Sequence, residues 1–140
     1  MGLSVKLERE TWISYDNCET FTEGNEELYW ANITHNLGNM AEKAGIYEAL
    51  WRPYILHNEY KDFGEDSQAE YTFEDSVKIT AKMITPILQK GYDNLVKKPK
   101  YFQKFNSKNG WGTYEHFLPF VKKYLDACYE YPNSIVITSR

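Results

Sequence analysis

The chain has 140 residues, of which 42% are apolar, 26% charged and 16% aromatic, with a net charge of −4. This size and balance are typical of one globular domain with a buried core, so a single domain over residues 1–140 is expected. Two cysteines are too few for a disulfide scaffold, and no apolar run approaches the roughly 20 residues that a membrane-spanning helix needs. Because the N-terminus also lacks the apolar region of a signal peptide, we expect a cytoplasmic protein without a membrane partner.

The charge is unevenly distributed along the chain. Residues 1–77 hold 5 basic and 16 acidic residues, whereas residues 78–123 hold 10 lysines and 2 acidic residues. This asymmetry predicts an anionic partner for the basic part, or attraction between the two parts within one chain or across a homo-oligomer interface. Lysines over 97–108 alternate with aromatic residues that could stack on bases, but a solvated helix end is the simpler interpretation. The overall acidity argues against nucleic acid as a partner.

The first third of the chain indicates strands. Residues 3–7 alternate between apolar and polar, and residues 11–15 are β-prone, so both segments are interpreted as strands that could form a hairpin. Residues 16–26 are polar and acidic and contain a Gly-Asn pair, which predicts a turn region. Residues 28–34 are rich in aromatic and β-branched side chains and predict a further strand.

Two short helices and a long loop are expected next. Apolar residues over 37–44 recur at helical spacing, and Gly45 is a natural C-terminal stop. A second helix is expected over 46–51, ending before Pro53. Residues 54–71 are acidic and lack a clear periodicity, which predicts a mobile surface loop, or a lid over a ligand.

The middle of the chain predicts two helices separated at a proline. Residues 72–75 resemble a capping box, which predicts a helix near 73–83. The Thr-Pro pair at 85–86 is typical of an N-cap followed by proline in the first turn, so a separate helix is expected near 86–97. A short helical turn near 100–105 follows.

The C-terminal part predicts one long helix and one strand. Apolar residues recur at helical spacing over 114–130, where Pro119 predicts a kink unless the helix starts late. Residues 135–137 are continuously apolar, which favours a strand inside the sheet. Strands therefore bracket a helical middle. The expected fold is α+β, with a small, largely antiparallel sheet of the N-terminal strands and the C-terminal strand packed against four or five helices.

Residues 106–115, Asn-Ser-Lys-Asn-Gly-Trp-Gly-Thr-Tyr-Glu, form the strongest candidate for a binding loop. Its Asn-Gly pair and the second glycine tolerate positive φ, and amides of such a turn before a helix can hold an anion. Thr113 offers a hydroxyl to the free amides at the start of the helix. Two interpretations of Trp111 stay open. The ring fills a hydrophobic gap, which is the favoured reading, or it forms part of a ligand wall.

Four runs of sequence are distinctive: 29–41, 47–53, Asn106 with 109–115, and 124–128. In these runs the chain resembles a family of small, largely uncharacterised proteins encoded by bacteriophages and prophages. The resemblance implies a phage-type accessory protein in the cytoplasm of the bacterial host, and it implies no activity or catalytic residues. Two features depart from the family pattern. Residues 57–72 look like an insertion, and Pro119 stands where an ordinary helix residue is usual.

No catalytic motif stands out in the sequence. The histidines His35, His57 and His116 lack metal-ligand spacing, and there is no Cys-x-x-Cys pair, so neither a metal nor a cofactor is expected. Cys18 and Cys128 are both expected to be thiols, with Cys128 buried on a helix face. A small enzyme that acts on a nucleotide or phosphate ester, with His35 or His116 as general acid or base, stays as an alternative.

We expect a non-enzymatic binding protein of phage type, which occupies a host factor or a small anionic, nucleotide-like ligand and could serve counter-defence. The ligand-binding residues are expected to be Trp111, Lys108, Asn109, Gly110, Thr113, Arg52, His35 and His116. Arg52 would act as an anion clamp. A third reading is a structural or oligomeric interaction protein, in which the acidic N-terminal part of one copy pairs with the basic part of its neighbour.

Overall fold

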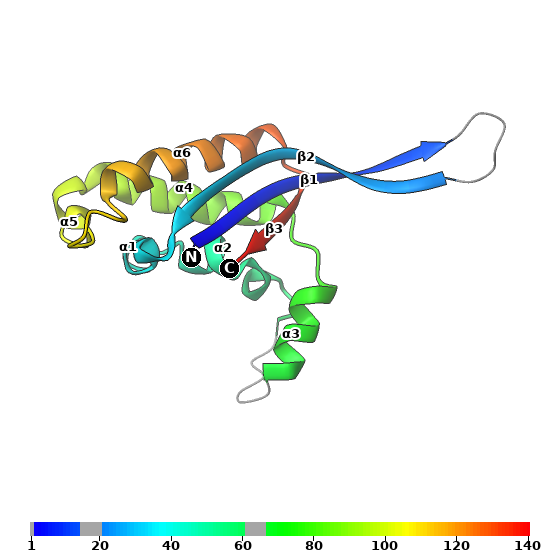
Figure 1. Cartoon of the computed structure of the whole chain (residues 1–140), viewed down its shortest axis with the longest axis horizontal. Helices are drawn as coiled ribbons and strands as arrows, with labels where there is room; N and C mark the ends of the chain where they lie inside the picture. The colour runs from blue at the N-terminus through cyan, green and yellow to red at the C-terminus, as the bar shows by residue number, and fades with distance from the viewer. Residues whose placement is uncertain (1, 15–20, 61–66) are drawn as a thin grey trace.

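The computed structural model describes residues 2–14, 21–60 and 67–140, with side chains described over 2–11, 24–60 and 72–140. The fold is α+β, as predicted, with an antiparallel three-stranded sheet in the order β2–β1–β3 (Figure 1). In chain order the elements are β1 (Gly2–Ser14), β2 (Phe21–Thr34), the 3-10 helix η1 (His35–Leu37), α1 (Gly38–Ala44), α2 (Tyr47–Trp51), the 3-10 helix η2 (Pro53–Leu56), α3 (Ser67–Ser76), α4 (Ala81–Lys97), α5 (Pro99–Gln103), α6 (Tyr114–Glu130) and β3 (Ile135–Ser139).

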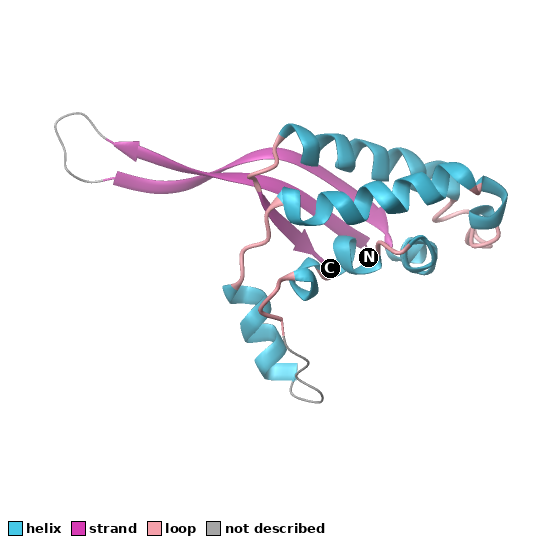
Figure 2. Ribbon diagram, turned by 180° about the vertical axis from the view of Figure 1, so that it is seen from behind, coloured by secondary structure: helices cyan, strands magenta, loops and turns pink. Residues whose placement is uncertain are grey.

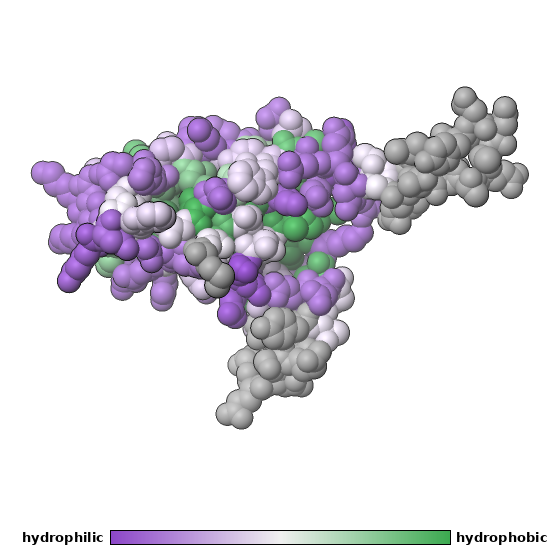
Figure 3. All heavy atoms as spheres, viewed as in Figure 1, coloured by the Kyte–Doolittle hydropathy of each residue, from purple (hydrophilic) through white to green (hydrophobic). Residues whose placement is uncertain are grey.

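The long helices α4 and α6 cover one face of the sheet, and the core lies between them and the central strand β1 (Figure 2). Alternate residues of β1 point toward the helices and are fully buried: Leu3, Val5 and Leu7. The opposite face is not covered by these helices and carries hydrophobic side chains among hydrophilic ones (Figure 3). There Lys6 pairs in register with Trp30 on one side and Ile137 on the other.

The ribbon of β1 and β2 is much longer than the rest of the sheet. Its pairing runs from Gly2 with Thr34 to Ser14 with Phe21, whereas β3 pairs only with residues 4–8 of β1. The register shifts between Leu7 and Glu8, which leaves Leu28 as the extra residue of a β-bulge on β2. Beyond the bulge the ribbon projects away from the helices (Figures 1 and 2). We call residues 8–14 and 21–27 the β-arm.

The β-arm corrects two predictions. Residues 2–14 form one strand rather than two, and 21–26 belong to β2 rather than to a turn. The reason is that a projecting ribbon has solvent on both faces, so its sequence does not need the apolar alternation from which a strand is recognised. Residues 15–20 of the expected turn lie outside the described residues.

The helical middle also differs from prediction. The helix α4 starts at Ala81 and continues through Pro86, because the amides of Ala81 and Lys82 donate to the carbonyls of Ser134 and Pro132, both at 2.9 Å. These bonds fix the start of the helix five residues before the proline, so the predicted break is wrong.

The predicted loop over 54–71 is wrong at both ends, because η2 occupies 53–56 and α3 begins at Ser67. Residues 72–75 therefore lie near the end of a helix instead of capping a new one. The central part of the expected loop, 61–66, lies outside the described residues.

Four helices agree with prediction: α1, α2, α5 and α6. Gly45 ends α1 with φ of 82°, and α6 runs over 114–130 as its apolar spacing indicates, with Pro119 inside it. The position predicted for the last strand is wrong, since β3 lies at an edge of the sheet and β1 at its centre. Only one side of β3 faces the core, with Val136 buried and Ile137 38% exposed.

Candidate functional site

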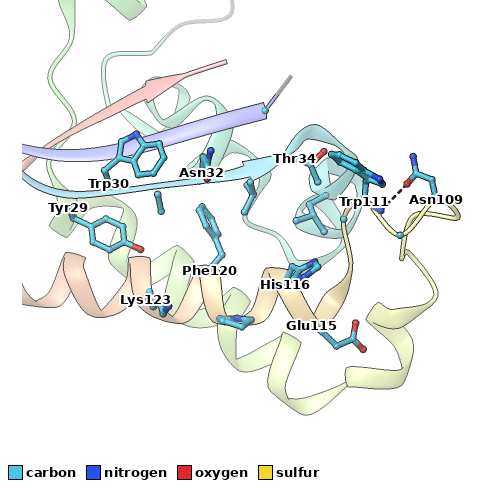
Figure 4. Close-up of a pocket in the computed structure, with 17 residues that line it drawn as sticks. Tyr29, Trp30, Asn32, Thr34, Asn109, Trp111, Glu115, His116, Phe120 and Lys123 are labelled. Carbon is cyan, nitrogen blue, oxygen red and sulfur yellow. Dashed lines mark hydrogen bonds between the residues drawn. The ribbon is translucent and has the colours of Figure 1, made fainter.

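A groove of about 840 Å³ runs between the outer edge of β2 and the helix α6 (Figure 4). One wall is formed by residues 29–34 of β2. Since successive strand residues point to opposite faces, a wall of consecutive residues follows the edge of the strand and not one of its faces. The opposite wall is a stripe of α6 at helical spacing: His116, Pro119, Phe120 and Lys123.

The edge of β2 along this groove is open. In the sheet, β2 pairs with β1 on one side and with no described strand on the other. Alternate residues of such an edge direct their backbone N–H and C=O groups outward, where another strand can bond to them. Residues 28–34, Leu-Tyr-Trp-Ala-Asn-Ile-Thr, contain no charge, proline or glycine. They therefore lack the features that protect exposed edges from pairing, and this edge is suited to receive a strand.

The floor of the groove is apolar. Tyr29 and Phe120 extend into the space between β2 and α6 (Figure 4), and Phe120 is only 6% exposed. The Tyr29 ring stacks on that of Tyr124, with 5.9 Å between centroids. Burial raises the pKa of Tyr29, and it raises the pKa of Tyr124 further. Both phenols therefore stay neutral at physiological pH, and the floor favours apolar groups.

The rim of the groove is polar and carries charges of both signs. Lys123 and His116 lie on α6, and Glu115 lies beside them. Trp30 on β2 and Trp111 in the loop are 49% and 71% exposed. Such a rim does not concentrate positive charge, and its exposed indole rings provide apolar contact area at low entropic cost.

The glycine loop closes the groove at the end of β2. Gly110 and Gly112 have φ of 77° and 108°, which confirms the predicted positive values. The Asn36 side chain donates from Nδ2 to the Trp111 carbonyl at 2.8 Å. A Cβ on Gly112 would lie 3.0 Å from the Cβ of Asn36 and 3.1 Å from Cγ2 of Thr34. The loop is therefore packed directly against the strand end.

Two predictions about this loop are wrong. Trp111 does not fill a hydrophobic gap, because its amide donates to Oδ1 of Asn109 and its carbonyl accepts from Asn36 while its ring faces solvent. Thr113 is the N-cap residue of α6, but its hydroxyl pairs with Nδ1 of His116 at 3.1 Å instead of a helix amide. The amide of Tyr114 donates to Oδ1 of Asn106 at 2.7 Å, so Asn106 provides the cap.

The predicted site residues are only partly brought together. Trp111, Asn109, Gly110 and His116 line the groove. Lys108 is exposed beside the loop, and Thr113 and Arg52 do not line the groove. His35 accepts a hydrogen bond from Nε1 of Trp51 at 3.3 Å, which gives it a structural partner on α2.

Sequence reasoning missed the residues that form the walls: Tyr29, Trp30, Pro119, Phe120 and Lys123. Two signals were present, namely the uncharged β-prone run at 28–34 and the helical stripe at 116, 119, 120 and 123. Neither shows that the two segments lie side by side, since β2 becomes an edge strand only through the order of the sheet.

Cys128 is buried in α6, as predicted, and is 1% exposed. Burial raises the pKa of its thiol to about 12, so the nucleophilic thiolate is not formed at neutral pH. Cys18 lies outside the described residues.

Over the described ranges 2–14, 21–60 and 67–140, no three His, Cys, Asp or Glu side chains group as a metal site, and no helix is long and apolar enough to cross a membrane. The chain matches no family model, no curated protein and no solved structure. The assignment of function therefore depends on the geometry of the groove.

Proposed function

We propose that this chain is a non-enzymatic binding protein that captures an extended segment of another polypeptide in the groove between β2 and α6. The observation that carries the proposal is the open, uncharged edge of β2 facing a stripe of helix across an apolar floor. A strand added there would bond to the β2 backbone, which supplies affinity. Its alternate side chains would contact the floor of the groove, and these contacts would supply specificity.

The dimensions of the groove define the segment. Residues 29–34 span about 17 Å at the rise of roughly 3.3 Å per strand residue, so five or six residues of a partner can pair with them. The partner side chains that lie over Tyr29 and Phe120 should be small or uncharged. The side chain nearest Lys123 should be acidic or neutral.

The setting of this proposal comes from the sequence resemblance. In a phage-type accessory protein, the captured strand would belong to a host factor, as in counter-defence, or to another phage-encoded chain. A small anionic ligand has less support, because Lys108 and Arg52 do not line the groove and Glu115 offsets Lys123. A phosphate-ester enzyme has less support as well, because only one of its two candidate histidines, His116, lines the groove, whereas His35 bonds to Trp51.

The test uses a displayed library of random linear dodecapeptides, selected on the purified protein. A selected peptide should slow amide hydrogen exchange over 29–34, and calorimetry should give its affinity. His116→Tyr, which fills the groove, and Lys123→Glu should each weaken binding about tenfold.

The matched control is Lys122→Glu. Lys122 is the neighbour of Lys123 on α6, is exposed and pairs with Asp126 at 2.8 Å, but does not line the groove. Its replacement should leave peptide affinity within about twofold. Peptides that protect a different segment, or that bind the filled variant equally well, would refute the proposal.

A further inference from the structure

The β-arm lies outside the packed body of the molecule. At its base Arg9 pairs with Glu26, and Lys78 on the body pairs with Glu10. Farther out, at residues 11–14 and 21–24, no described helix lies against the ribbon in either view (Figures 1 and 2). A two-stranded ribbon without a packed face is marginally stable in water. An arm of this length therefore indicates a surface elsewhere that receives it.

The arm is strongly acidic. Its residues, 8–14 and 21–27, include Arg9 as the one basic residue against five acidic residues: Glu8, Glu10, Glu23, Glu26 and Glu27. At the other end of the molecule, residues 97–108 contain five lysines and no acidic residue: Lys97, Lys98, Lys100, Lys104 and Lys108. The groove opens toward this basic segment at its loop end and carries Lys123 in its wall.

We propose that the strand captured in the groove is the β-arm of a second copy of this chain, in a two-fold dimer in which each arm fills the other copy's groove. This inference rests on the proposed function, because it requires that the groove accept a strand. It gives one partner to two features of each copy: the β-arm, which packs against no described helix, and the edge of β2 at 29–34, which pairs with no described strand. A two-fold arrangement completes both at once and closes on itself, so it adds no further copies.

The position of α6 selects the arm as the inserted segment. A strand added to the edge of β2 lies above the α6 wall of the groove. If residues 28–34 of two β2 strands paired with each other, the α6 helices of both copies would have to occupy the same space beside the paired strands. Residues 21–27 bring no helix with them, because they belong to the projecting part of the ribbon. The two-fold axis then passes near Leu28, where the bulge bends the strand.

Charge selects the direction of pairing. In the antiparallel arrangement, the acidic arm of one copy runs past Lys123 and toward the lysines at 97–108 of the other. In a parallel arrangement the two acidic arms would lie side by side and repel each other. The antiparallel dimer therefore accounts for the separation of charge along the sequence, with 5 basic and 16 acidic residues over 1–77 and 10 lysines and 2 acidic residues over 78–123.

A cross-linking experiment tests the arrangement directly. Asn25 and Asn32 lie seven residues apart on the same strand, about 23 Å at the rise of a β-strand, so a disulfide between them cannot form within one chain. One full-length chain carries Asn25→Cys, and a second chain with a different tag carries Asn32→Cys. Both also carry Cys18→Ser, and the two chains are mixed under mild oxidation. A disulfide between the two tags is expected. Asp93→Cys, on the exposed side of α4, replaces Asn32→Cys as the control and should give none.

Sedimentation velocity at several protein concentrations supplies the second readout. The dimer dissociation constant should rise about tenfold in Lys123→Glu, because each change acts twice in a two-fold dimer. Lys122→Glu should change it less than about threefold. Added salt should also weaken the dimer, since the arm and the lysines are exposed charges.

The outcomes separate this inference from the proposed function. A dimer with the mixed disulfide and the expected Lys123→Glu effect supports both. A monomer whose groove still takes selected peptides, or a dimer without the mixed disulfide, overturns the second copy as partner and leaves strand capture standing. A monomer that takes no peptide overturns both.

Discussion

The two edge strands of the sheet, β3 and β2, differ in how far the chain itself covers them. At the β3 edge the chain itself closes the start of the strand. The Val136 amide donates to the Ile79 carbonyl at 2.7 Å, and Thr80 forms a bridge with Ile135. Arg140 then fastens the strand end, donating to the Trp51 carbonyl at 2.9 Å and pairing with Glu74 at 2.9 Å. At the β2 edge, residues 29–34 meet a groove instead.

The difference shows which edge is structural and which is available. The chain covers the start of β3 with residues 79–80, but residues 28–34 of β2 are uncharged and have no described strand on their outer side. Within β2 itself the contrast is repeated, because the arm half carries Glu23, Glu26 and Glu27 whereas 28–34 carries no charge. Charge protects the part of an edge that must not pair nonspecifically, and its absence marks the part where a strand is received.

The largest effect is expected from a charge at the closed edge. Val136→Asp places a carboxylate in the core opposite Leu7, and should lower the free energy of unfolding by about 3 kcal/mol or more. The next residue is the control. Ile137→Asp points to the uncovered face and should cost less than about 1 kcal/mol. Urea unfolding followed by circular dichroism measures both, and equal losses would mean that β3 is not packed as described.

A smaller effect is expected at the end of the open edge. Gly112→Ala combines a positive φ with close contacts to Asn36 and Thr34, and should cost about 2 kcal/mol. Gly110→Ala has a positive φ but no atom within 4 Å, so it should cost about 1 kcal/mol. The same urea experiment measures the difference. Equal costs would show that the loop is not pressed against β2, and the end of the groove would then be undefined.

A still smaller effect is expected from removing the Arg140 side chain at the closed edge. Arg140→Ala loses the half-buried charged hydrogen bonds to Trp51 and Glu74 and should lower the free energy of unfolding by about 1–2 kcal/mol. Arg9→Ala removes the exposed pair with Glu26 and should cost less than about 1 kcal/mol. If the two replacements cost the same, the β3 edge is held by its backbone bonds alone.

The sequence predicts the parts of this molecule whose patterns are local. The apolar stripe of α6, the stop at Gly45 and the positive φ values of the loop glycines follow from residue chemistry at short range. The α+β class follows from the order of strands and helices. The start of α4 did not, because its first amides are bonded by Pro132 and Ser134, about 50 residues away in the chain.

The groove could not be predicted for the same reason. The uncharged run at 28–34 is equally typical of a central strand. The opposing stripe on α6 is equally typical of a helix side that faces the core. What makes them a site is the order β2–β1–β3, which leaves β2 at an edge. The exposure of Trp111 was also mispredicted, because the loop is docked through its backbone to Asn36 rather than through its indole ring.

The smallest effect at neutral pH, which grows on the alkaline side, concerns the buried thiol of Cys128 on α6 and the tyrosines of the groove floor. Burial raises the pKa of Cys128 from 9.0 to about 12, so between these values the folded state keeps a proton that the unfolded state releases. The free energy of unfolding should therefore be unaffected below about pH 8 and should decrease as pH rises above 9. The raised pKa values of Tyr29 and Tyr124 add to this decrease above pH 10.

Unfolding measured in urea from pH 6 to 10.5 tests this dependence. Cys128→Ala should make the decrease between pH 9 and 10 shallower, while its own cost at pH 7 stays constant down to pH 6. An unchanged slope in this variant would show that the thiol is not shielded as the structure places it. If a strand covers the groove, it buries Tyr29 further, so a bound peptide or second copy should steepen the tyrosine part of the decrease.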